Sequence, residues 1–112
     1  MDALLRHGTD RYGPRHSPAW VSSLDLRTLS YPANAPPAPC GQRVYRDIDT
    51  PFGSTLYWDQ PLLVTAYNLS RMTGDPSYAA AADAYLLDFV AHCTADTGLF
   101  QWGNHLYYNV FS

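Results

Sequence analysis

The feature that most constrains the fold of this chain is a very short connection between two segments with helical spacing. Gly74 is suited to end the first segment, and Asp75 and Pro76 are suited to begin the second as N-cap and first helical residue. Because about two residues cannot carry the chain across to a new direction, the two helices must run back antiparallel. The sequence therefore predicts a helical hairpin.

The two helices are predicted from the spacing of their apolar residues. The first is expected over residues 59–73, with Asp59 as N-cap, and the second over 76–93. Apolar side chains recur three and four positions apart in both segments, so each helix presents one apolar face. The residues expected to be largely buried between them are Leu62, Ala66, Leu69, Tyr85 and Phe89.

Composition excludes several classes of function. The chain has 112 residues, which suits at most one domain, and a net charge of −3, which gives no basic surface for nucleic acid. No apolar run is long enough to cross a membrane. Cys40 and Cys93 lack the spacing of a zinc site, and no dinucleotide or phosphate-binding fingerprint is present. We therefore expect neither a metal nor an organic cofactor, and the sequence leaves the cellular location open.

The remainder of the chain is expected to be mostly irregular. Residues 10–57 form a predicted long loop region with a proline-rich stretch at 30–41 and a weak strand pattern at 20–26. Neither end of the chain carries a helix cap or a closing element. We therefore interpret residues 1–112 as a partial domain truncated at both ends, in which the hairpin of residues 59–93 leaves apolar side chains exposed.

Three stretches together resemble a known family. The phrase "MTGDPSYAAAADAYLLDF" is similar to the hairpins of the (α/α)6-toroid proteins, or six-hairpin glycosidases. The flanking stretches "STLYWDQPLL" and "TGLFQWGNHLYYN", with "GTDRYGPRHSPAWVSSLDLR" near the start, resemble bacterial toroid proteins of the pectate-lyase-like or glycoside-hydrolase-like kind. The resemblance implies an all-α toroid fold, of which this chain holds one hairpin, and a carbohydrate-active protein. The rest of the toroid would be missing.

The candidate site follows from the hairpin geometry. The short turn marks one end of the hairpin, so the connections 10–57 and 94–105 lie at the opposite end, which we call the loop end. Sites are commonly built from long loops on a rigid scaffold. The residues with suitable side chains in or beside these connections are Arg11, His16, Tyr57, Trp58, Asp59, Trp102 and His105.

Two of these residues are candidate proton carriers. Asp59 suits a general acid or base, and His105 suits a proton carrier or a donor to substrate. Each has a structural alternative: Asp59 also suits the helix N-cap, and His105 suits a hydrogen-bonded structural histidine.

The other candidates are binding residues. Tyr57, Trp58 and Trp102 could stack on sugar rings, although tryptophans also fill cores. Arg11 and His16 could bind the carboxylate of a uronate, although they could equally hold their own loop in place.

The favoured function is therefore cleavage of poly- or oligosaccharides. Hydrolysis would use Asp59, or an aspartate elsewhere, as proton donor. A lyase would need a base near C5 of the sugar and a cation for its carboxylate, for which His105 and Arg11 are the expected pair. The chain alone is expected to be inactive. The alternative is a non-catalytic helical-repeat module that binds through its aromatic side chains.

Overall fold

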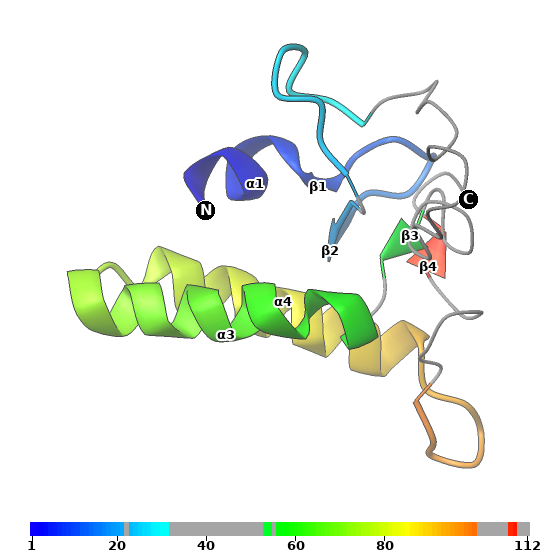
Figure 1. The fold of residues 1–112 in the computed structure, drawn as a ribbon. Helices are drawn as coiled ribbons and strands as arrows, with labels where there is room; N and C mark the ends of the chain where they lie inside the picture. Colours follow the sequence, from blue (N-terminus) through cyan, green and yellow to red (C-terminus); the bar gives the residue numbers. More distant parts are fainter. Residues whose placement is uncertain (22, 32–52, 55, 101–107, 110–112) are drawn as a thin grey trace, which may run out of the picture.

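The computed structural model describes residues 1–21, 23–31, 53–54, 56–100 and 108–109. Two long helices form one layer, and a short helix with a strand pair forms the other (Figure 1). In chain order the elements are α1 (Asp2–His7), β1 (Thr9–Asp10), β2 (Ser17–Trp20), β3 (Gly53–Ser54), α3 (Leu56–Thr73), α4 (Ser77–His92) and β4 (Tyr108–Asn109).

The predicted hairpin is confirmed. Helices α3 and α4 lie side by side and run in opposite directions (Figure 1). Gly74 has a φ of 77°, the left-handed conformation in which a helix ends readily at glycine. Asp75 acts as the cap of α4, because its Oδ1 accepts a hydrogen bond of 2.8 Å from the backbone N–H of Ser77. The same bond lowers the pKa of the Asp75 carboxyl.

Helix α3 begins earlier than the sequence predicted. Its first residue is Leu56, so Asp59 lies inside the helix and is not its N-cap, which corrects the expected start at residue 59. Pro61 therefore also lies inside the helix, five residues after its first residue. The earlier start has a packing reason, since Leu56 is apolar and contacts the core.

The core lies between the hairpin and the N-terminal layer. Ala66, Tyr85 and Phe89 are buried as predicted, but Leu62 and Leu69 are only half-buried. Leu63 and Ala66 belong to the same buried cluster as Trp20 of β2, whereas Leu62 packs against this cluster from its edge. The buried core residues are Ala19, Trp20, Leu63, Ala66, Ala82, Tyr85, Phe89 and Cys93.

Strand β2 supplies the aromatic centre of the second layer. Trp20 is fully buried, and its ring centroid lies 5.1 Å from that of Tyr85 on α4. β2 pairs antiparallel with β1, so the N-terminal layer contains a strand pair, whereas the sequence predicted an all-α fold with one weak strand pattern in this region. The strand expected at 20–26 is found earlier, at Ser17–Trp20, because Asp25 begins a turn in which its carboxylate accepts the backbone N–H groups of Arg27 and Thr28.

Several large apolar side chains of the hairpin are exposed and lie outside the core. Leu87 is 72% exposed and Val64 is 58% exposed. We call this surface the outer face, defined by Val64, Tyr67, Met72, Leu87 and Val90. The predicted exposure of apolar side chains on the two helices is thus found. Among the described helices, none has the length and apolar character that a membrane-spanning helix needs.

Candidate functional site

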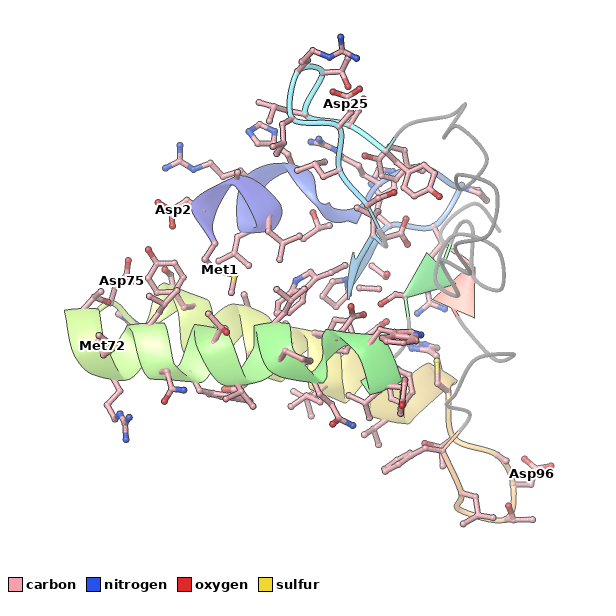
Figure 2. All side chains as sticks on the ribbon, viewed as in Figure 1. Met1, Asp2, Asp25, Met72, Asp75 and Asp96 are labelled. Atoms are coloured by element: carbon pink, nitrogen blue, oxygen red, sulfur yellow. The ribbon has the colours of Figure 1, made fainter. Side chains whose placement is uncertain are left out.

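The loop end of the hairpin brings together four separate segments of the chain. Strand β3, which directly precedes α3, pairs antiparallel with β4, and an isolated bridge joins Thr94 to Phe100 just after α4. Figure 2 shows Asp96 at this end and Asp75 at the other. Residues on both sides of segment 101–107 are therefore anchored at the loop end. Trp102 and His105 themselves lie outside the described residues, so their predicted roles stay predictions.

Asp59 is the buried polar centre of the loop end. Its side chain is fully buried, and its Oδ2 accepts hydrogen bonds from the hydroxyl groups of Tyr85 (2.8 Å) and Ser54 (3.0 Å). The two hydroxyl oxygens are 3.0 Å apart. One carboxylate oxygen thus connects β3, α3 and α4. A carboxyl group without exposed surface cannot touch a polysaccharide in this conformation, and the predicted proton transfer by Asp59 stays a prediction.

A second polar cluster lies beside the last turns of α4. Arg15 reaches over from the loop after β1, with its Nη2 3.4 Å from Asp88 Oδ1 and 2.7 Å from His92 Nε2. Nδ1 of His92 lies 3.1 Å from Asp88 Oδ1. The same Arg15 nitrogen lies 3.1 Å from Nδ1 of His92, so the guanidinium faces both ring nitrogens. The Arg15 side chain is 45% exposed, which leaves it open to a solvent-borne anion.

The interior next to this cluster favours neutral groups. Burial raises the pKa of the Cys93 thiol, and the nearby charge of Asp88 raises it further. Burial also raises the pKa of Asp10, although hydrogen bonds from Ser17 and Tyr12 and the charge of His16 act in the opposite direction. Cys93 is therefore a protonated core thiol and not a nucleophile.

A groove opens on the exposed side of the loop end. It has a volume of about 180 Å³ and is lined by Leu56, Tyr57, Gln60 and Phe100. The rings of Tyr57 and Phe100 are 44% and 47% exposed. Trp58 is half-buried beside them, and its Nε1 is a buried donor without a hydrogen-bond partner among the described residues. The groove thus offers aromatic faces and one amide.

The structure brings some of the predicted site residues together and leaves others elsewhere. Tyr57, Trp58 and Asp59 share the first turns of α3 at the loop end. Arg11 instead donates to the backbone carbonyls of His7 and Leu29, which is the loop-holding arrangement considered as its alternative. His16 is exposed and contributes its charge to the surroundings of Asp10.

Sequence reasoning missed several residues of the loop end. The missed residues of the two helices are Asp88, His92 and Gln60. Asp88 and His92 are four positions apart on α4, and Gln60 is three positions after the predicted Tyr57 on α3, which are the spacings of helix neighbours. This spacing could have been recognised in the sequence. Nothing local indicated that Arg15 would contact α4. Among the described residues, no three His, Cys, Asp or Glu side chains are grouped as a metal site would require.

Comparison with known proteins defines the class. A family model described as periplasmic pectate lyase matches residues 44–112, which include the whole hairpin and the part of the loop end from residue 44 onward. The chain is thus related to enzymes that act on polysaccharides. It belongs to the periplasmic pectate lyase family. Searches of curated proteins and of solved structures found no match.

Proposed function

We propose that this chain is part of a lyase that cleaves a uronate-containing polysaccharide by β-elimination. The observation that carries the proposal is the family match over residues 44–112. The match covers the hairpin and the part of the loop end that carries Asp59 and the exposed aromatic rings, whereas Arg11 and Arg15 precede the matched residues. We further propose the α/α-toroid arrangement, in which a neighbouring hairpin covers the outer face.

The chemistry requires a base and a positive charge. The base removes the proton from C5 of the uronate, the electron pair forms the C4–C5 double bond, and the glycosidic oxygen leaves C4 with a proton. A cation next to the carboxylate stabilises the charge that develops during this step. We propose His105 as the base. Arg15, which lies exposed at the loop end, supplies positive charge together with or in place of Arg11.

The position of Asp59 favours elimination over hydrolysis. Hydrolysis would need Asp59, or an aspartate elsewhere, as the proton donor. The Asp59 carboxyl is buried and bonded to two hydroxyl groups, so it does not reach a substrate in this conformation. In the proposed lyase, Asp59 holds the start of α3 against α4, and so fixes the side chains that reach the surface from the first turns of α3.

The test is the product formed by the full-length protein from polygalacturonate. Elimination creates a conjugated double bond that absorbs ultraviolet light, whereas hydrolysis releases reducing ends without this absorbance. We expect both signals to rise together, and His105→Ala to lower the rate by about 100-fold or more with unchanged helix content. Reducing ends without absorbance would contradict the lyase and support a hydrolase.

A non-catalytic role has one observation in its favour. The apolar outer face is the surface that a helical-repeat module would use to contact its neighbours. If the protein retained polysaccharide but released no product with either signal, the binding module would replace the lyase.

A further inference from the structure

The exposed groove at the start of α3 has the composition of a sugar-binding surface. Tyr57 and Gln60 are three residues apart, so they lie on the same side of α3, and Phe100 approaches from the bridge after α4. Two exposed aromatic rings beside an amide are unusual on a surface that only faces water. Contact between aromatic rings and water is unfavourable, so such rings are typical of a binding surface.

Both rings are held in place from behind. Tyr57 packs edge-on against Trp58, with ring centroids 5.0 Å apart and an interplanar angle of 84°. Phe100 packs edge-on against the buried Phe89, with centroids 6.1 Å apart. A ring that is fixed before binding loses little conformational entropy when a ligand stacks on it. The groove is thus arranged for a flat, partly apolar ligand.

The groove also lacks charge. Of the described residues, those that line it are Leu56, Tyr57, Gln60 and Phe100, and none of them is ionised. The Gln60 amide can donate to and accept from the hydroxyl groups of a sugar. No side chain in this set carries a positive charge that could form an ion pair with a carboxylate, and Arg15 belongs to a separate cluster with Asp88 and His92.

We propose that Tyr57, Gln60 and Phe100 form a subsite that binds one sugar ring of the polysaccharide by its face and hydroxyl groups, without reading its carboxylate. The proposal rests on the proposed function for the identity of the polymer. It goes further by assigning a subsite that accepts a uronate, its methyl ester or a neutral sugar equally. In this proposal, the arginines elsewhere at the loop end distinguish a charged uronate from a neutral sugar.

Binding is tested separately from cleavage. The full-length protein is run through native gels that contain either polygalacturonate or highly methyl-esterified pectin, and retardation gives the dissociation constant. We expect Tyr57→Ala and Phe100→Ala each to weaken binding about 2- to 10-fold, and by the same factor for both polymers. Tyr57→Phe keeps the ring and should bind as the parent protein does.

The control is Leu26→Ala, which removes an apolar side chain that is 80% exposed and lies outside both the groove and the outer face. It should leave retardation unchanged, and circular dichroism verifies folding of every variant. In the cleavage assay, Tyr57→Ala should raise KM and leave kcat near the parent value.

The outcomes separate the two proposals. If the parent protein cleaves the polymer and Tyr57→Ala and Phe100→Ala bind it as tightly as the parent does, the subsite is overturned and the lyase proposal is supported. Weaker binding in a protein that cleaves nothing supports the subsite and overturns the lyase. A loss confined to polygalacturonate overturns the charge-independent subsite. If the folded parent protein is retarded by neither polymer, the subsite is overturned, and the groove is then a contact for apolar side chains of another protein.

Discussion

Tyr85 joins the two long helices through a single hydroxyl group. The group donates to Asp59 across the core, and Ser54 donates to the same carboxylate oxygen. A buried acceptor that loses a donor cannot recover the bond from water, so such a hydroxyl contributes more than one at the surface. The carboxylate of Asp59 thus depends on partners from two other elements.

At this scale we predict that Tyr85→Phe lowers the free energy of unfolding by about 1–3 kcal/mol, because the buried acceptor loses one donor. The control is Tyr78→Phe, on the same helix as Tyr85, which removes an exposed hydroxyl that also donates to an aspartate, Asp2, at 2.8 Å. Water can replace that bond, so its effect should be much smaller. Urea unfolding of the full-length protein measures both. Equal losses of unfolding free energy in the two variants would show that the buried hydrogen bonds to Asp59 contribute no more to stability than an exposed one.

At the scale of the element, the hairpin turn carries the strongest local constraint. Gly74 needs a positive φ, and the next residues set the start of α4 through the Asp75 cap. An added Cβ at Gly74 would meet no atom within 4 Å, so a side chain there is opposed by backbone conformation and not by crowding. The turn is therefore selective for residues that tolerate the left-handed region.

We predict that Gly74→Ala destabilises the protein by about 1–2 kcal/mol and that Gly74→Asn does so by clearly less, because asparagine adopts the left-handed conformation more readily. Thermal unfolding, followed by circular dichroism, ranks the stabilities of the parent protein and the two variants. A destabilisation by asparagine that matches or exceeds that of alanine would mean that side-chain crowding, and not φ, limits this position.

At the scale of the whole molecule, the two layers leave the outer face uncovered. The core side of α4 packs on β2, whereas Leu87 and Val90 point away from it. Apolar surface of this extent is typical of a contact site. The same surface suits both the neighbouring hairpin of a toroid and association between copies of the chain.

We predict that the 112-residue chain on its own self-associates through the outer face. The double substitution Val64→Thr and Leu87→Gln should lower its light scattering several-fold without loss of helix content. Leu26→Gln is the control, because Leu26 is 80% exposed in the turn at residues 25–30, away from the outer face. Equal scattering by the double variant and the parent chain would contradict this use of the outer face.

The sequence by itself determined the hairpin, because its signals are local. Apolar spacing within each helix, the left-handed glycine and the Asp75 cap all act over a few residues, so they hold in any tertiary setting. The resemblance of the flanking phrases likewise indicated a polysaccharide-acting family before any contact was known. The predicted start of the first helix was wrong. Asp59 suits an N-cap, but α3 begins at Leu56, whose side chain packs against the core.

Only the tertiary structure decided which side chains meet at the loop end. Arg15 and His92 are 77 positions apart, and Tyr85 and Asp59 are 26 apart, so no local pattern could pair them. Such contacts depend on how two layers pack, since packing decides which hydroxyl reaches a buried carboxylate and which arginine reaches the end of α4. The groove between Tyr57 and Phe100 arises in the same way, because the bridge after α4 turns one aromatic ring toward another on α3.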